Sequence, residues 1–108
     1  MKARIVTGCT VIADRLRRAC ELAGLEYEVA PLDEPGKFDL LIVDQDARPP
    51  QPEELRIRFP EASLFVRTRS RTRLYLLELV QRGATATLGY SMCAQTIAEV
   101  LCGALSRN

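Results

Sequence analysis

The stretch FDLLIVDQDARP, residues 38–49, is a short apolar run that ends in two acids and then stops at a proline. A continuous apolar run of this length is typical of a strand buried on both faces, as in a parallel α/β sheet. Such a strand would bring the carboxylate of Asp44 to the carboxyl edge of the sheet, where ligand sites form. Asp44 is therefore the first candidate for a functional residue.

Short apolar runs alternate with amphipathic stretches on both sides of this segment, which indicates a parallel sheet with helical crossovers. The expected strands cover residues 3–7, 27–30, 38–43, 63–67 and 84–88. The expected helices cover residues 11–23, 52–59, 73–81 and 94–105. For the first of these helices, Thr10 is the expected N-cap and Gly24 the expected stop.

The connection between the second and third expected strands is only residues 31–37, too short for a crossover helix. An extended segment of that length reaches about 25 Å, enough to carry a bare chain back along a short strand. Pro31 and Pro35 favour such an extended path. The alternative is a hairpin turned at Pro35 and Gly36, which would make the sheet mixed. We expect the crossover, with one face of the sheet left open as a possible docking surface.

The composition is that of an ordinary globular protein, with 47% apolar and 27% charged residues in a chain of 108. We expect one domain over residues 1–108. The formal net charge of +1 does not indicate a partner. The chain opens without the apolar stretch of a signal peptide and holds no run long enough to cross a membrane. The expected location is cytoplasmic, away from membranes.

The four cysteines form no CxxC pair, and histidine is absent. This pattern disfavours a zinc site and fits small, buried cysteines in a reducing compartment. The lack of histidine also removes the most common general base. We therefore expect no metal, no cofactor and no enzymatic activity.

The five-strand pattern resembles the receiver domain of two-component response regulators over nearly the whole chain. This resemblance implies signal transduction and a flavodoxin-like, doubly wound five-stranded parallel sheet of order 2-1-3-4-5. The second crossover helix is expected to be shortened or missing. Receivers carry a phosphorylatable aspartate at the end of strand three, and Asp44, which closes DLLIVD, takes that place. They carry a Thr or Ser at the end of strand four, and counting back from Gly83 places Thr68 there.

Other receiver positions are substituted in this chain. Receivers end strand one with two acids that hold magnesium, whereas this chain has Thr7 and Gly8. Receivers close strand five with a lysine and a proline, whereas TLGYS supplies Tyr90 and Ser91. The position of the receiver's switch aromatic is Thr87.

Phosphoryl transfer to a carboxylate requires neutralising charge, which a metal ion and a lysine normally supply. Without them, the resemblance implies a pseudo-receiver in which Asp44 and Thr68 mark a vestigial phospho-acceptor site. In the simplest interpretation, Asp44 is a strand-end acid held by backbone amides or by a neighbouring arginine, and Thr68 is an ordinary loop hydroxyl.

Cys9 and Arg15 fit the Cys-x5-Arg spacing of phosphatase loops, and they follow a first strand as those loops do. In such loops, backbone amides hold the phosphate and the thiolate attacks it. Val11 and Ile12 are too bulky for a tight anion nest, which favours glycine. A Cys9-dependent phosphatase or phosphocarrier is therefore kept only as an alternative.

A basic patch is expected from VRTRSRTR, which carries Arg67, Arg69, Arg71 and Arg73. The simplest interpretation is a solvated loop paired with nearby glutamates. The alternative is a site for nucleic acid or an acidic protein. No aromatic residue lies between the arginines, which weakens the case for stacking single-stranded bases.

The last two expected helices carry more apolar residues than one face can hide. In residues 73–81, Leu76, Leu77 and Val80 are expected to pack on the sheet. Residues 94–105 are apolar on nearly all sides, and such a helix is usually covered on most sides. We therefore expect a homodimer or another protein partner docked on these helices. The expected interface residues are Tyr75, Leu79, Val100 and Leu101.

Overall fold

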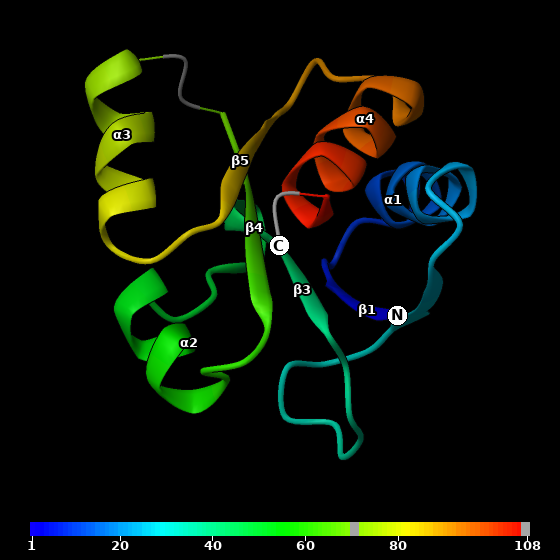
Figure 1. Ribbon diagram of the computed structural model, residues 1–108, viewed down its shortest axis with the longest axis horizontal. Coiled ribbons are helices and arrows are strands. Elements are labelled where there is room, and N and C mark those ends of the chain that lie inside the picture. The colour runs from blue at the N-terminus through cyan, green and yellow to red at the C-terminus, as the bar shows by residue number, and fades with distance from the viewer. Residues whose placement is uncertain (70–71, 107–108) are drawn as a thin grey trace.

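The computed structural model describes residues 1–69 and 72–106 and contains one five-stranded parallel sheet (Figure 1). The strand order is β2-β1-β3-β4-β5, so the expected order 2-1-3-4-5 is confirmed. The strands are β1 (Lys2–Val6), β2 (Glu26–Val29), β3 (Leu40–Asp44), β4 (Ser63–Thr68) and β5 (Ala86–Gly89). Each lies within two residues of its expected position.

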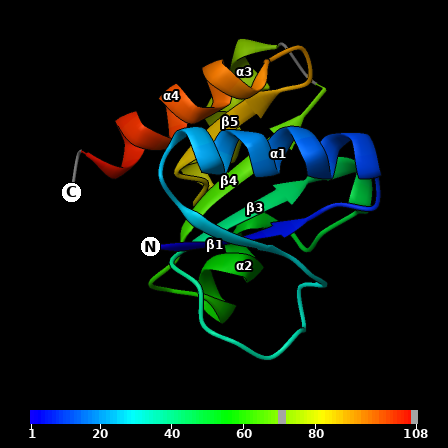
Figure 2. The same ribbon diagram turned by 90° about the vertical axis from the view of Figure 1, so that its right-hand side faces the viewer.

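Helices cover both faces of the sheet, with α1 and α4 on one face and α2 and α3 on the other (Figures 1 and 2). The helices are α1 (Thr10–Leu22), α2 (Pro52–Arg58), α3 (Arg73–Gln81) and α4 (Ala94–Leu105). A 3-10 turn, η1 (Gln45–Ala47), follows β3 directly. None of the helices in the described part of the chain has the length and apolar character needed to span a bilayer.

Strand β3 is the central strand of the sheet, and all five of its residues are buried. Successive side chains of a strand point to opposite faces. Leu40 and Ile42 accordingly join the core beneath α1 and α4, whereas Leu41 and Val43 join the core beneath α2 and α3. The apolar run that predicted a doubly covered strand therefore supplies both cores.

The start of α1 differs from the prediction. Thr10 is the first residue of the helix, and the N-cap is Cys9, whose side chain makes no capping bond. The turn after β1 is closed instead by Thr7, whose hydroxyl accepts the Cys9 N–H at 3.2 Å. Gly24, with a φ of 73°, follows the end of α1 in the left-handed region that favours glycine, as expected.

The connection from β2 to β3 is a crossover, as expected, because both strands lie parallel to β1 and on opposite sides of it. Residues 30–39 contain turns and bends but no helix. They cover the face of the sheet over β1, so the expectation that this face lies open is wrong. The missing crossover helix is replaced by a loop.

Arg4, in the middle of β1, holds this loop in place. Its side chain is only 1% exposed and forms an ion pair with Glu28 at 2.8 Å. The guanidinium also donates to the carbonyl oxygens of Leu32, Glu34 and Pro35. One buried cation therefore satisfies several backbone acceptors that a helix would otherwise have paired internally.

Two further contacts tighten the loop around Arg4. Gly36 has a φ of 140°, and a Cβ at that position would lie 3.2 Å from an Arg4 nitrogen. The Phe38 ring lies under the guanidinium, with its centroid 4.6 Å from Cζ. The loop passes close to the arginine because glycine has no side chain at the tightest point.

Candidate functional site

Asp44 lies at the carboxyl edge of the sheet and is 1% exposed. One carboxylate oxygen accepts the Thr7 hydroxyl at 2.8 Å. The other accepts the Arg67 guanidinium at 3.0 Å and the backbone N–H of Asp46 at 3.3 Å. Both oxygens are thus engaged by donors of the protein itself, in agreement with the simplest interpretation of this acid.

Arg67 supplies the positive charge at this site. Strand β4 continues to Thr68, and its register places Arg67 directly opposite Asp44. Arg67 is 4% exposed, and its Cζ lies 3.6 Å from the centroid of the Tyr90 ring. Its assignment to an exposed basic patch was wrong, because the register with β3 turns its side chain toward the buried carboxylate.

The ring of Tyr90, at the position where the resemblance places the lysine of receivers, contacts two guanidinium groups. The Arg69 Cζ is 5.1 Å from the ring centroid, beyond the closer stack with Arg67. The Tyr90 hydroxyl is buried, and none of the described residues pairs with it in full hydrogen-bond geometry. Burial raises the pKa of Tyr90, and nearby Asp46 acts in the same direction.

Asp46 is the outer acid of this cluster. The neighbouring Tyr90 hydroxyl and the Arg69 guanidinium hold the pKa of Asp46 below its ordinary value. Arg69 and Asp46 form an ion pair at 3.2 Å, with side chains 75% and 49% exposed. The site therefore contains a buried acid–arginine pair and a second, solvated pair above it.

Thr68 is buried at the end of β4. Its hydroxyl donates to the side-chain oxygen of Gln45 at 2.5 Å. The Gln45 amide nitrogen in turn donates to the Tyr75 hydroxyl on α3. A chain of polar contacts thus links β4, η1 and α3 beside the Asp44 site. Sequence reasoning missed Gln45, although its place directly after Asp44 was visible.

A magnesium ion, which the receiver resemblance implies, does not fit these donors. Magnesium prefers hard oxygen ligands, commonly one or two carboxylates together with water and phosphate. The two positions where receivers carry acids hold Thr7 and Gly8, and the oxygens of Asp44 already accept from Arg67 and Thr7. Within residues 1–69 and 72–106, no group of three or more acids and cysteines is arranged to hold a metal.

Several solved structures of response regulators have the same architecture as this chain. One match is an atypical orphan response regulator with a phosphorylation-independent regulatory mechanism, at a TM-score of 0.81 and 11% identity, covering 98% of this chain and 96% of the other. The chain has a receiver fold. The CheY-like receiver domain from Methanospirillum hungatei matches with a TM-score of 0.75 and 18% sequence identity. The match covers 98% of this chain and 94% of the other.

HP1043, an orphan response regulator of H. pylori, also matches the receiver fold of this chain, at a TM-score of 0.79 and 10% identity, covering 97% of this chain and 96% of the other. No family model and no curated protein sequence matches the chain. The identities are low, so the shared feature is the fold itself.

The rest of the predicted basic patch is only partly assembled. Arg69 is engaged by Asp46, and Arg73 is exposed at the first position of α3. Arg71 lies outside the described residues. Arg56 donates to backbone carbonyls beyond its own helix, and Arg58 pairs with Asp33 of the loop. Among the described residues, Arg56, Arg58 and Arg67 make contacts that hold the fold together.

The Cys-x5-Arg pair is not assembled as a phosphate site. Cys9 is exposed at the N-cap of α1, as a phosphatase cysteine would be. Arg15, however, donates to the backbone carbonyl of Tyr90 at 3.0 Å. The arginine that would bind a phosphate instead ties α1 to the end of β5.

The orientation of α3 was predicted the wrong way round. Leu79, expected at an interface, is 3% exposed, and Tyr75 is half-buried in the same core. Leu77 and Val80, expected on the sheet, are 50% and 46% exposed. Apolar residues on nearly all sides of the helix leave open which side faces the sheet. In the structure residues 75 and 79 face it, and Tyr75 accepts a hydrogen bond from Gln45.

The interface prediction for α4 is also partly wrong. Leu101 is fully buried against the sheet, together with Ile97 and Ala98. Val100 is partly buried against the same core. Leu101 cannot contact a partner in this structure because the helix already uses it to cover the sheet.

Proposed function

We propose that this chain is a regulatory module with a receiver fold that works without phosphorylation. The observation that carries the proposal is the Asp44 carboxylate, whose two oxygens accept from Arg67, Thr7 and the Asp46 N–H. Arg67 supplies from within the chain the positive charge that a metal ion and a lysine would otherwise provide. Asp44 then has a structural role, and no residue of the site is catalytic.

The fold comparison supports this proposal. The atypical orphan regulator with a phosphorylation-independent mechanism shares the receiver fold with this chain. A receiver fold that no longer switches by phosphorylation still presents its surfaces to partners. We therefore place the function in protein–protein contact.

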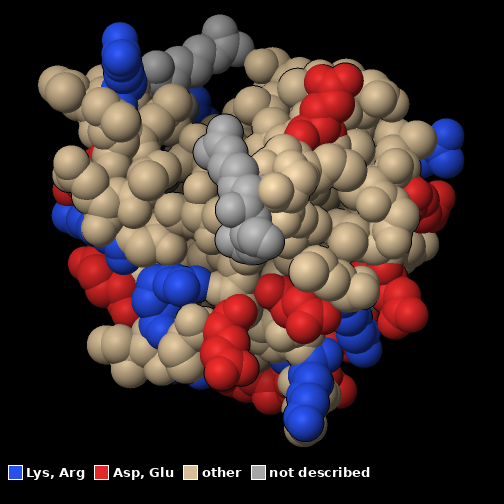
Figure 3. All heavy atoms as spheres, viewed as in Figure 1, with Lys and Arg blue, Asp and Glu red and all other residues tan. Residues whose placement is uncertain are grey.

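The proposed docking surface is the outer side of α3. Three side chains at intervals of three residues form what we call the α3 stripe, namely Leu74, Leu77 and Val80. They are 77%, 50% and 46% exposed. The view over α3, β5 and α4 is mostly uncharged, whereas charged side chains gather lower down, around α2 and the loop (Figure 3).

The proposed occupant of the α3 stripe is a second copy of this chain. An isologous contact brings the same patch together from both subunits, so a nearly uncharged apolar stripe meets no repulsion from its own copy. Burial of such side chains stabilises a dimer by about 25 cal/mol per Å² of apolar surface, less the cost of association. This surface replaces the one predicted from Tyr75, Leu79, Val100 and Leu101.

Phosphorylation is tested directly by intact-protein mass spectrometry after incubation with acetyl phosphate and magnesium. The expected result is an unmodified mass under conditions that modify a functional receiver domain run in parallel. A phosphorylated product that disappears in Asp44→Asn would overturn the proposal.

The dimer is tested by sedimentation equilibrium of the wild type, Leu77→Glu and Val11→Glu. Val11 is 65% exposed on α1 and serves as a matched apolar-to-acid control. We expect the wild type and Val11→Glu to associate at tens of micromolar and Leu77→Glu to remain monomeric. A wild-type monomer at that concentration, or equal association of both variants, contradicts the second-copy proposal but leaves the phosphorylation proposal standing.

A further inference from the structure

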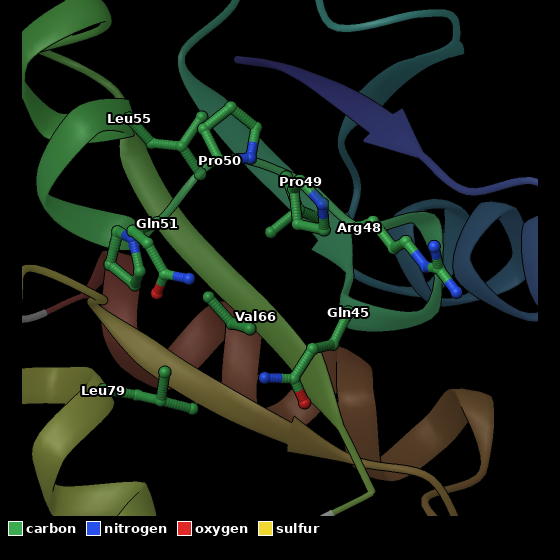
Figure 4. A pocket seen from close by; sticks show the side chains of 10 residues that line it. Gln45, Arg48, Pro49, Pro50, Gln51, Leu55, Val66 and Leu79 are labelled. Carbon is green, nitrogen blue, oxygen red and sulfur yellow. The ribbon is translucent and has the colours of Figure 1, made fainter.

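A cavity of about 270 Å³ lies between α2 and α3, beside the polar chain that runs through Gln45 (Figure 4). Its lining includes Val43 of β3, Val66 of β4, Leu55 of α2 and Leu79 of α3. These four side chains are at most 4% exposed. The inner part of the cavity is therefore aliphatic and belongs to the core beneath the two helices.

The rim of the cavity is polar and stiff. Gln45 and Gln51 point their amides toward the hollow from two sides (Figure 4). Between them the chain runs through Pro49 and Pro50, and Pro52 follows Gln51 directly. Proline fixes φ, so this rim has few conformations to lose when a ligand binds. Apolar walls with a few convergent polar groups are the usual composition of a small-molecule site.

The charge of the lining restricts the ligand. Arg48 is the single ionisable side chain among the ten described residues that line the cavity. Its side chain extends away from the other labelled residues (Figure 4). Arg82 also reaches the rim, where it donates to the Gln51 oxygen at 3.5 Å. An ion in the aliphatic inner part would lose its hydration without a counter-charge beside it, which is costly. A neutral ligand meets no such penalty.

The size of the cavity restricts the ligand further. An apolar cavity of about 150 Å³ accommodates benzene. The larger volume here has room for a planar bicycle of about ten heavy atoms. An edge group on such a ring would face the Gln51 amide, whose oxygen accepts from Arg82 and whose nitrogen has no hydrogen-bond partner among the described residues.

We propose that this cavity binds a small, neutral, planar heterocycle, held by the four aliphatic side chains and by the amides of Gln45 and Gln51. Gln45 also accepts from Thr68 and donates to Tyr75, so a ligand that moves its amide is sensed at the end of β4 and on α3. The site is separate from the Asp44 carboxylate and does not depend on the proposed regulatory role.

The probe is indole, a neutral bicycle with one donor, added to uniformly ¹⁵N-labelled protein and followed by amide chemical shifts. We expect saturable shifts at Gln45, Gln51, Val66 and Leu79, extending to Thr68 and Tyr75, with a dissociation constant of about 1 mM. Nuclear Overhauser contacts between the indole ring and the methyl groups of Val43 and Val66 would place the ring in the cavity without any mutation.

Two comparisons complete the test. Gln51→Trp puts a ring of the protein into the cavity and should abolish the shifts, whereas Glu53→Trp, on the exposed side of the same helix, should leave them unchanged. Indole-3-carboxylate should bind at least threefold more weakly than indole, because its charge has no partner inside. No saturable shift, equal binding by both variants, or tighter binding of the carboxylate would each overturn the proposal.

Discussion

Two arginines, Arg4 in β1 and Arg67 in β4, are almost fully buried, at 1% and 4% exposure. They differ in the groups that they bind. Arg4 meets three backbone carbonyls and Glu28, a carboxylate that remains 26% exposed at the edge of the loop. Arg67 meets Asp44, which is itself buried, and stacks on Tyr90.

The difference lies in where the negative charge is placed. The partner of Arg4 remains in contact with water, so loss of Arg4 leaves a solvated acid and a loosened loop. The partner of Arg67 has no access to water, so loss of Arg67 leaves an unpaired charge in the interior. Arg4 holds the loop between β2 and β3 in place, whereas Arg67, in the proposed function, supplies the positive charge at Asp44. Substitution of each arginine should separate these two roles.

The largest effect is expected for Arg67→Ala. Breaking a buried ion pair by removing one partner costs about 3–5 kcal/mol because the other charge is stranded. Chemical denaturation should show that loss in the free energy of unfolding. The double variant Asp44→Leu, Arg67→Met removes both charges and should recover most of the loss. A double variant no more stable than Arg67→Ala would mean that the pair does not act as one buried unit.

Arg4→Met is expected to have a smaller and local effect. Hydrogen bonds from a charged donor contribute about 1.5–3 kcal/mol. We expect a loss of about 2–3 kcal/mol in unfolding free energy, with faster amide exchange confined to residues 30–39. Exchange that rises equally in α3 would show that Arg4 supports the whole sheet and not the loop alone.

The sequence predicted the fold but not the use of either arginine. The apolar run that forms β3 predicted a strand covered on both faces. The alternation of short apolar runs with amphipathic stretches predicted the parallel sheet. Arg67 was misplaced because its role depends on the register of β4 against β3, which a single sequence does not contain. The anchoring by Arg4 was missed because it depends on contacts with carbonyls of a distant loop.

Some residues of the candidate site were predictable from the sequence, but the orientation of the helix beside it was not. Substitution of acids by Thr7 and Gly8 is visible in the sequence, and so is the acid at Asp44. The orientation of α3 was not predictable, because apolar residues lie on all sides of the helix and the pattern does not show which side faces the sheet. In the structure Leu79 and Tyr75 face the core, and Tyr75 also accepts a hydrogen bond from Gln45.

The pH dependence of the Arg4 anchor is a third test. Arg4 holds the pKa of Glu28 below its ordinary value of 4.5. A lowered folded pKa means that Glu28 contributes its full stability above the unfolded pKa, and that this contribution is lost as the pH falls through the folded pKa. The stability difference between the wild type and Glu28→Gln should therefore shrink on acidification from about pH 5 to pH 3. A difference that does not change with pH contradicts a charged Arg4–Glu28 pair.

The smallest effect is expected for Asp46→Asn. The Asp46–Arg69 pair is solvated on both sides, and exposed pairs contribute about 0–1 kcal/mol. Its removal should change the free energy of unfolding far less than Arg67→Ala does, and the contribution should fall with added salt. A loss as large as that of Arg67→Ala would place the essential charge pair at Asp46 instead of Asp44.

The most direct test of the central claim is a titration of ¹⁵N-labelled protein with beryllium fluoride and magnesium, a mimic of the aspartyl phosphate. Arg67 and Thr7 already engage the oxygens of Asp44, and Thr7 and Gly8 stand where the resemblance places the two metal-binding acids of receivers. We predict no change in the amide shifts around Asp44 and Thr68. A saturable, magnesium-dependent shift at both residues would contradict the account.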